Sequence, residues 1–181
     1  LVRGLRLQPG DRVLDLCCGT GDLAYLGAAE TIAGMTVGLD FASEMITVAQ
    51  SRAGWCVSQH RPVWIRGDAL RLPFPNHSFD AAMIGYGLRN LADVRNALGE
   101  ISRVLRPGGR LAILETGLPR GRLVAALHHC YLRRGIRLLA GLVHGSAEMH
   151  RYLASSALAF ASPEEIGKDC AAAELNVSEV R

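Results

Sequence analysis

The sequence lacks the strong charge imbalance of a nucleic-acid-binding protein. Its 181 residues carry 20 Lys and Arg against 17 Asp and Glu, which gives a net charge of +3. Proteins that bind nucleic acid concentrate positive charge on one surface, and an excess this small and dispersed does not indicate one. Internal repeats and low-complexity tracts are also absent. With 49% hydrophobic residues the chain can bury one good core, so we expect a single domain over residues 1–181.

Cysteine pairs typical of zinc sites are missing. The chain has five cysteines, but no two are spaced as C-x-x-C and no histidine accompanies them at zinc-ligand spacing. Cys17 and Cys18 are adjacent, so on a strand they would point to opposite faces and could not hold one metal together. We therefore expect no metal site, and the odd number of cysteines fits reduced thiols in a cytosol-like compartment.

A long uninterrupted apolar segment is missing as well. The longest apolar region, residues 123–143, contains Arg133, Arg134 and Arg137, and a segment with these charges is not expected to span a bilayer. A secretory signal-peptide pattern is not seen either. A helix over residues 123–143 would be both basic and apolar, so it could rest on an anionic membrane surface.

Short β-rich runs alternate with longer helix-patterned runs, which predicts an α/β fold with a mostly parallel sheet. Ser43 and Ser162 are expected helix N-caps, and Pro163 suits the first turn of a helix. Pro73 and Pro75 forbid a helix between the third and fourth strands. The expected strands are residues 11–18, 35–40, 62–68, 79–87, 110–117 and a sixth from 177, and the expected helices are residues 21–33, 43–53, 92–105, 123–143 and 162–174.

The expected strand ends carry most of the chemical signal in the sequence. In an open parallel sheet, ligands bind beyond the carboxyl ends of the strands, where the strand order reverses. Most of these ends are acidic or glycine-rich, which a sheet with a purely structural role would not need. The ends are residues 15–21, 40, 68, 85–90 and 115–117.

The residues at these ends suit an adenosyl ligand with a cationic tail. Gly19 and Gly21 allow a sharp turn against which a ligand can lie. Asp40 follows about twenty residues later, where a carboxylate can accept hydrogen bonds from both ribose hydroxyls. Asp68 can accept from an adenine amino group, and Asp15 stands where a cation would be favoured. Each feature alone also has a structural explanation as a turn glycine or an N-cap, but their combination after three successive strands favours a ligand.

A nicotinamide or flavin site is the nearest alternative, because the segment "GTGDLA" satisfies the pattern G-x-G-x-x-A. Asp40 does not separate the two ligands, since both contain a ribose. A dinucleotide also brings a pyrophosphate, which Asp15 and Asp22 would repel. S-adenosylmethionine has no phosphate and carries positive charge, so these acids favour it.

Four segments resemble the class I S-adenosylmethionine-dependent methyltransferases of the demethylmenaquinone, demethylphylloquinone and ubiquinone C-methyltransferase family. They read "VLDLCCGTGDLA", "GLDFASEM", "GDALRLPFPNHSFDAAMIGYGLRN" and "EISRVLRPGGRLAILE". The resemblance runs from Leu7 to Glu165, and its most specific part is the "GYGLRN" block. It implies a Rossmann-like fold, with helices on both faces of a mostly parallel sheet, and S-adenosylmethionine as cofactor.

The resemblance also implies a substrate site and a set of cofactor-binding residues. Arg89 and Asn90 would bind the oxygen of a prenylated quinol beside the transferred methyl group, and Arg89 would stabilise the forming phenolate. Tyr86, His128 and His129 are weaker candidates for removing the quinol proton. The residues expected to line the cofactor are Asp15, Gly19, Thr20, Gly21, Asp40, Phe41, Met45, Asp68, Ala69 and Gly85.

Terminal parts of the family pattern are expected to be missing from this chain, namely a helical region before the first strand and the final pair of strands.

Two alternatives to quinol methylation stay open: methylation of another small molecule, and a catalytically impaired module that binds S-adenosylmethionine. A nucleic-acid methyltransferase is disfavoured, because "GYGLRN" lacks the N/D-P-P-Y/F pattern. The sequence favours a cytoplasmic or plastid-stromal location, and it leaves homodimerisation and peripheral membrane contact open.

Overall fold

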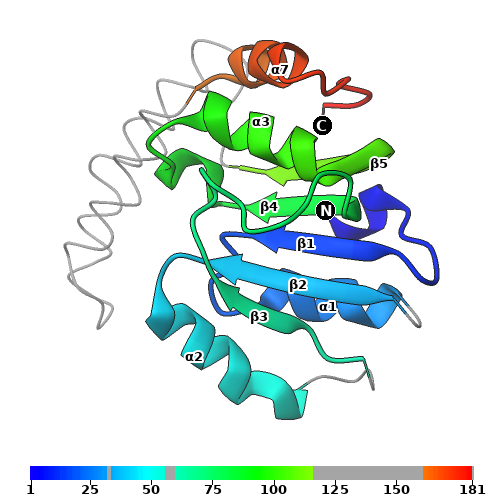
Figure 1. Cartoon of the computed structure of the whole chain (residues 1–181), viewed down its shortest axis with the longest axis vertical. Helices are drawn as coiled ribbons and strands as arrows, with labels where there is room; N and C mark the ends of the chain where they lie inside the picture. Colours follow the sequence, from blue (N-terminus) through cyan, green and yellow to red (C-terminus); the bar gives the residue numbers. More distant parts are fainter. Residues whose placement is uncertain (32–33, 56–59, 116–160, 181) are drawn as a thin grey trace, which may run out of the picture. The chain divides into compact units, whose positions relative to one another are not determined.

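Five parallel strands form one sheet in the order β3-β2-β1-β4-β5 (Figure 1). The structure, a computed structural model, describes residues 1–31, 34–55, 60–115 and 161–180. The expected α/β fold with a mostly parallel sheet is confirmed. The strands are β1 (Arg12–Leu16), β2 (Met35–Asp40), β3 (Val63–Arg66), β4 (Phe79–Gly85) and β5 (Leu105–Leu114).

Helices cover both faces of this sheet. Helix α1 contacts β1 and β2 and lies behind β2 in Figure 1, whereas α3 contacts β5 and lies in front of it. The described α-helices are α1 (Asp22–Glu30), α2 (Ser43–Ser51), α3 (Val94–Val104) and α7 (Pro163–Ala172), and the 3₁₀ helices are η1 (Val2–Leu5), η2 (Arg52–Trp55) and η3 (Leu88–Asn90).

The strand order reverses at β1. This strand pairs with β2 on one side and β4 on the other, so that Leu14 lies opposite both Val37 and Ala82. Because the connections from β1 and β4 lead away in opposite directions, the space beyond their carboxyl ends stays open. The central strands are buried on both faces, as parallel sheets require. Fully buried side chains from β1, β4 and α3 include Val13, Leu14, Leu16, Met83, Ile84, Leu98, Ile101 and Val104.

Arg103 of α3 holds the segment that connects β3 to β4. Its guanidinium donates to the carbonyls of Phe74 at 2.8 Å and Leu72 at 3.1 Å, and to the side chain of Asn76 at 2.9 Å. Glu100 accepts from Arg103 Nε and Nη2 at 2.7 and 2.8 Å, and from the backbone N of Leu72 at 2.7 Å. One ion pair on α3 thus satisfies several backbone groups of a segment that has no regular structure of its own.

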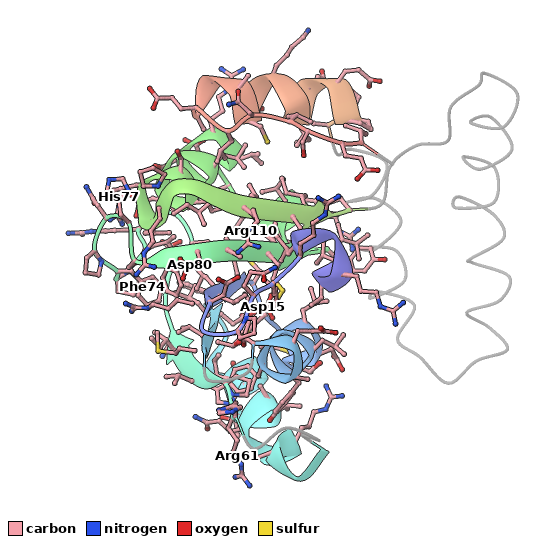
Figure 2. All side chains as sticks on the ribbon, turned by 90° about the vertical axis from the view of Figure 1, so that its right-hand side faces the viewer. Asp15, Arg61, Phe74, His77, Asp80 and Arg110 are labelled. Carbon is pink, nitrogen blue, oxygen red and sulfur yellow. The ribbon has the colours of Figure 1, made fainter. Side chains whose placement is uncertain are left out.

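The end of this connecting segment is tied to the beginning of β4 and to the end of α3. Figure 2 shows Phe74, His77 and Asp80 together at this edge of the sheet. The Phe74 ring packs edge-on against Phe79 with 4.9 Å between ring centroids. The backbone N of His77 donates to the carbonyl of Arg103 at 3.0 Å. The connection is therefore fixed from its middle to its end.

The structure corrects three details of the sequence-based prediction. Ser43 is the first residue of α2 rather than its cap, because Ala42 takes the cap position with extended backbone. Strand β5 begins at Leu105, earlier than expected, because α3 passes directly into the strand and the pairing with β4 is irregular there. Residues 177–180 form no strand.

The expected start of α7 is confirmed by a capping box. Ser162 Oγ accepts from the backbone N of Glu165 at 3.3 Å, and the Glu165 carboxylate accepts from the backbone N of Ser162 at 2.8 Å.

The chain divides into two compact units, residues 1–115 with 169–178 and residues 116–168 with 179–181. The single domain expected from the sequence stays a prediction.

The helix expected over residues 123–143 lies outside the described residues. Of the helices that the structure describes, none has the length and apolar character needed to cross a membrane.

We expect Arg103→Lys to lower the free energy of unfolding by about 2 kcal/mol, because lysine cannot reproduce the forked contacts and leaves carbonyl groups unsatisfied. Urea unfolding followed by circular dichroism measures this change. Arg95→Lys is the control, since the Arg95 side chain is 79% exposed and pairs with Asp169 at the surface; its effect should stay below about 0.5 kcal/mol. Equal effects of the two substitutions would contradict the role given to Arg103.

Candidate active site

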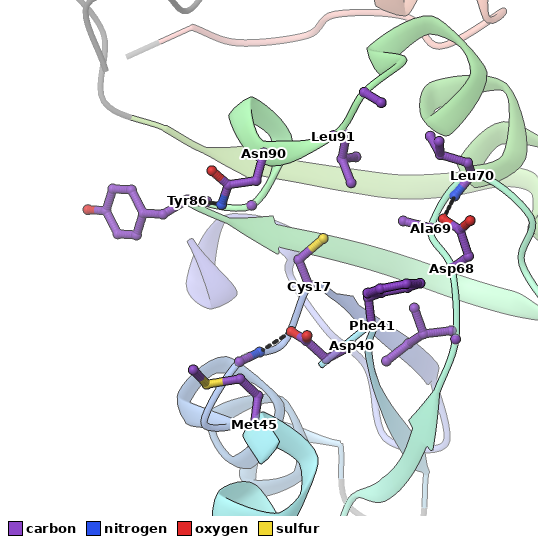
Figure 3. A pocket seen from close by; sticks show the side chains of 15 residues that line it. Cys17, Asp40, Phe41, Met45, Asp68, Ala69, Leu70, Tyr86, Asn90 and Leu91 are labelled. Carbon is purple, nitrogen blue, oxygen red and sulfur yellow. Dashed lines mark hydrogen bonds between the residues drawn. The ribbon is translucent and has the colours of Figure 1, made fainter. Parts of the chain in front are cut away.

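Two adjoining cavities open beyond the carboxyl ends of β1, β2 and β4. Their volumes are about 410 and 320 Å³, and Cys17, Gly19 and Tyr86 line both of them. The larger cavity, shown in Figure 3, is also lined by Leu39, Asp40, Phe41, Met45, Gly67, Asp68, Ala69, Leu70, Gly87, Asn90, Leu91 and Ala92. The smaller cavity is also lined by Asp15, Cys18, Thr20, Asp22, Leu23, Gly85 and Leu114.

Asp40 anchors the turn that follows β1. Its Oδ2 accepts a hydrogen bond from the backbone N of Gly19 at 2.8 Å (Figure 3), and its Oδ1 accepts from the backbone N of Ala42 at 2.9 Å. The two amides fix the orientation of the carboxylate, and each of its oxygens retains further acceptor capacity. A carboxylate held in this way is suited to accept from the two adjacent hydroxyls of a ribose.

Asp15 is a buried carboxyl group at the end of β1 that lines the smaller cavity. Its exposed fraction is 1%, and neither of its oxygens has a hydrogen-bond partner among the described residues. Burial raises the pKa of Asp15 to about 8. The backbone N–H of Ala24 lowers this pKa in part, and the nearby carboxylates of Asp40 and Asp22 raise it further. An unsatisfied buried group costs folding free energy, so a cation in the smaller cavity would relieve a cost already present in the fold.

The larger cavity combines exposed apolar side chains with an acid. Phe41 is 71% exposed and Met45 is 43% exposed, although large apolar side chains are usually buried. Asp68 is exposed, its Oδ1 accepts from the backbone N of Leu70 at 2.9 Å, and the neighbouring Ala69 is buried. An aromatic base with an amino group suits such a surface, because its faces need apolar cover and its amino group needs an acceptor.

The two glycines of the turn have different roles. A Cβ at Gly21 would lie 2.4 Å from the ring of Trp64, and its φ of +85° is left-handed. Gly21 is therefore required by packing against β3, and it is not among the residues that line either cavity. Gly19 has a φ of +52°, but a Cβ there would meet nothing within 4 Å. The space beside the backbone is open to a ligand at Gly19 and closed at Gly21.

Cys17 and Tyr86 have left-handed backbone, with φ values of +50° and +56°. Such values are uncommon for residues with a Cβ and concentrate at functional sites. Burial raises the pKa of Cys17 to about 12, with nearby carboxylates adding to the rise, so this thiol is a poor base and a poor nucleophile at neutral pH. Tyr86 is 48% exposed, and its ring points away from the larger cavity in Figure 3.

Arg89 is not among the residues that line either cavity. Its guanidinium lies 3.4 Å from the Glu115 carboxylate, and its backbone N donates to the same carboxylate at 3.3 Å. The guanidinium carbon also lies 5.7 Å from the centroid of the Tyr86 ring. This geometry does not favour direct contact between Arg89 and a bound quinol, whereas Asn90 of the same turn lines the larger cavity.

Asp22 has a cationic partner that the sequence did not indicate. Arg52 Nη2 contacts Asp22 Oδ1 at 2.7 Å, and Thr20 Oγ1 donates to Asp22 Oδ2 at 2.8 Å. These hydrogen bonds lower the pKa of Asp22. The repulsion expected between Asp22 and a pyrophosphate is therefore weakened by Arg52.

Most of the site residues expected from the sequence lie around the two cavities. Gly21 and Arg89 are the exceptions, and His128 and His129 lie outside the described residues. Some lining residues were given no role in ligand binding by the sequence analysis, because small and apolar side chains carry no chemical signal beyond their nearness to a strand end. These are Cys17, Cys18, Leu23, Leu39, Gly67, Leu70, Gly87, Leu91, Ala92 and Leu114.

The sequence pattern of the ubiE/COQ5 methyltransferase family matches residues 3–179, which include all the strand ends described above. The chain belongs to the ubiE/COQ5 methyltransferase family. The family expected from the four motif segments is thereby confirmed, together with the expected class of enzyme, an S-adenosylmethionine-dependent methyltransferase.

Individual relatives agree with this family. The 2-phytyl-1,4-naphtoquinone methyltransferase of Synechococcus elongatus is 43% identical over 88% of this chain and 68% of its own length. The demethylmenaquinone methyltransferase of Thermus thermophilus is 41% identical over 92% of this chain and 74% of its own length. A solved S-adenosylmethionine-dependent methyltransferase from Aquifex aeolicus has a TM-score of 0.70 at 18% identity, with 99% of this chain and 79% of that chain covered. The last comparison supports the Rossmann-like fold alone.

The two glycines are expected to respond differently to substitution by alanine. Gly21→Ala should lower the free energy of unfolding by about 2 kcal/mol or more, because its methyl group collides with Trp64 in a left-handed backbone. Gly19→Ala should cost about 1 kcal/mol in backbone strain and should also weaken the binding of S-adenosylmethionine. Urea unfolding and calorimetry separate the two effects. Unchanged binding by Gly19→Ala would show that the ligand does not approach this backbone.

Asp15→Asn is expected to remove a pH dependence of stability. The pKa of Asp15 is about 8 in the fold, against an ordinary value of 3.8, so the folded state retains a proton that the unfolded chain has lost. The stabilisation from this proton is complete below the ordinary pKa and disappears as the pH rises through about 8. The free energy of unfolding of the unchanged protein, minus that of Asp15→Asn, should therefore fall over this range in urea titrations without cofactor. A flat difference would refute the buried, protonated state.

Proposed function

We propose that this chain catalyses S-adenosylmethionine-dependent C-methylation of a prenylated 1,4-naphthoquinol, of the demethylmenaquinol or demethylphylloquinol type, in quinone biosynthesis. The names of the relatives from Synechococcus elongatus and Thermus thermophilus support this class of acceptor. These names favour a quinol over the two alternatives, another small-molecule acceptor and a catalytically impaired binding module.

The observation that carries the choice of cofactor is the buried carboxyl group of Asp15 in the smaller cavity, which has no hydrogen-bond partner in the part of the chain that the structure describes. S-adenosylmethionine, when bound, supplies a methyl group on a sulfonium, which is an excellent leaving group. Asp15 would favour the cationic part of this molecule, Asp40 would hold its ribose, and Asp68 with Phe41 would hold its adenine. A pyrophosphate has no comparable place, because Asp40 would repel its charge and the protonated carboxyl group of Asp15 would offer it no cation.

The remaining task of the chain is to align the acceptor carbon with the methyl group and to exclude water. Leu70, Leu91 and Ala92 supply apolar wall in the larger cavity, and Asn90 supplies a polar group among them. An amide side chain can both donate to and accept from a quinol oxygen. We therefore assign the quinol contact to Asn90.

A quinol ring carbon becomes more nucleophilic when the neighbouring hydroxyl group loses its proton. The raised pKa of Cys17 and the outward direction of the Tyr86 ring make these two side chains unsuitable as the base. A phenolate formed at Asn90 would be stabilised by hydrogen bonding to the amide N–H.

A prenylated acceptor resides in membranes, so the proposal includes peripheral contact with a bilayer. The basic helix expected at residues 123–143 is outside the described residues, and the contact stays a prediction. Homodimerisation and a cytoplasmic or plastid-stromal location stay predictions as well.

Transfer of tritium from labelled S-adenosylmethionine to chemically reduced demethylmenaquinone tests the proposed reaction. We expect methylation of the prenylated naphthoquinol, and activity at least about tenfold lower with simple phenols. Calorimetry should show binding of S-adenosylmethionine and no binding of NADH. Methylation of phenols alone would favour the other small-molecule acceptor, and binding without transfer would favour the impaired module.

Asn90→Ala should lower kcat/KM for the naphthoquinol by about ten- to a hundredfold, because a buried oxygen of the acceptor loses its hydrogen bond. The affinity for S-adenosylmethionine should change by less than about threefold, since Asn90 is not expected to contact it. Asn176→Ala is the matched control, because Asn176 is exposed and is not among the residues that line either cavity. Normal turnover by Asn90→Ala would remove Asn90 from the acceptor site.

A further inference from the structure

We propose that Glu115 is a positioning residue for methyl transfer. Glu115 ties the turn of residues 86–90 to the end of β5, and this contact places Asn90 in the wall of the larger cavity. This inference rests on the proposed function, because the turn matters for the reaction only if the larger cavity takes the acceptor. Glu115 is not among the residues that line either cavity, so it acts through Arg89 and not by touching a ligand.

The first tether of this turn is an extension of the sheet. Gly85, the last residue of β4, lies opposite Leu114, the last residue of β5. One residue further, the backbone N of Tyr86 donates to the carbonyl of Leu114 at 2.8 Å. At Tyr86 the chain then turns away with a φ of +56°. A left-handed residue with a Cβ persists only where its surroundings hold it, so the turn needs support beyond this hydrogen bond.

Glu115 supplies that support at the far end of the turn. Its carboxylate accepts from the backbone N of Arg89 at 3.3 Å and from Arg89 Nη1 at 3.4 Å. The exposed fractions of the two side chains are only 8% for Arg89 and 9% for Glu115. Charges shielded from water interact more strongly than charges at the surface, and removing one of them leaves the other poorly compensated.

Arg89 of this ion pair also contacts Tyr86, the residue with left-handed backbone. The Arg89 guanidinium lies over the ring of Tyr86, 5.7 Å from its centroid, at a distance where a cation and an aromatic face attract each other. One carboxylate is thus linked to the backbone of the turn at Arg89 and, through the guanidinium, to Tyr86.

Asn90 depends directly on the shape of this turn. Its backbone N donates to the carbonyl of Gly87 at 3.0 Å, and its Nδ2 donates to the carbonyl of Tyr86 at 3.4 Å. Because both acceptors belong to the turn, a change in its backbone would move the Asn90 amide relative to the larger cavity. The effect of Glu115 should therefore appear in turnover more than in cofactor binding.

Glu115→Gln in the full chain tests this role, because glutamine keeps the size of the side chain and removes its charge. Hydrogen exchange followed by mass spectrometry should show at least about tenfold faster exchange of amides in residues 86–91. With the reduced prenylated naphthoquinone, kcat should fall at least about tenfold while KM changes less, and the affinity for S-adenosylmethionine should stay within about threefold. Glu115→Asp should restore part of kcat, because it restores the charge.

Two further variants complete the test. Glu30→Gln removes an exposed acid at the end of α1 and should change none of these quantities. The double variant R89Q/E115Q replaces the buried ion pair by a neutral pair, so it should fold even if Glu115→Gln does not, and it should retain the loss of kcat.

Unchanged exchange in Glu115→Gln, or faster exchange with kcat within about twofold of the unchanged protein, would overturn the proposal. Failure of the proposed function looks different, because the unchanged protein itself would then transfer no methyl group to a naphthoquinol. In that case the exchange of residues 86–91 still decides whether Glu115 holds the turn.

Discussion

The reversal of strand order between β1 and β4 is the constraint on which the rest of this structure depends. It opens a space at the carboxyl edge of the sheet, because the connections from these two strands lead away from each other. The ends of β1, β2 and β4 all meet this space, and the segment after β3 supplies Asp68 and Ala69. The cavities therefore follow from topology, and the residues at the strand ends decide what can bind there.

The charges at this edge are not arranged for stability alone. Asp22 has Arg52 as a partner and Asp40 has two backbone amides, so both carboxylates are satisfied within the fold. Asp15 is buried without a hydrogen-bond partner among the described residues, at a cost in folding free energy. A fold under selection for stability alone would replace this side chain. The proposed function explains its presence beside an open cavity by a ligand that carries positive charge.

Around the cavities, strained backbone is held by contacts from neighbouring elements. Tyr86 and Cys17 leave their strands in left-handed conformations, and the turn after Tyr86 is tied to the end of β5 by Glu115. The segment after β3 is held from the other side by Arg103 of α3. The site is thus formed by loops that are held by two charged side chains, Arg103 in α3 and Glu115 directly after β5.

The sequence by itself determined the alternation of strands and helices, the parallel sheet, the acidic strand ends and the family. Hydrophobic periodicity, turn glycines and motifs are local patterns, and each can be read without knowing the fold. Only the tertiary structure decided that Gly21 packs against Trp64, that Arg89 turns toward Glu115 and that Asp15 is buried away from hydrogen-bond partners in residues 1–31, 34–55, 60–115 and 161–180. Each of these facts depends on the distance between segments far apart in the chain, and no local pattern encodes such a distance.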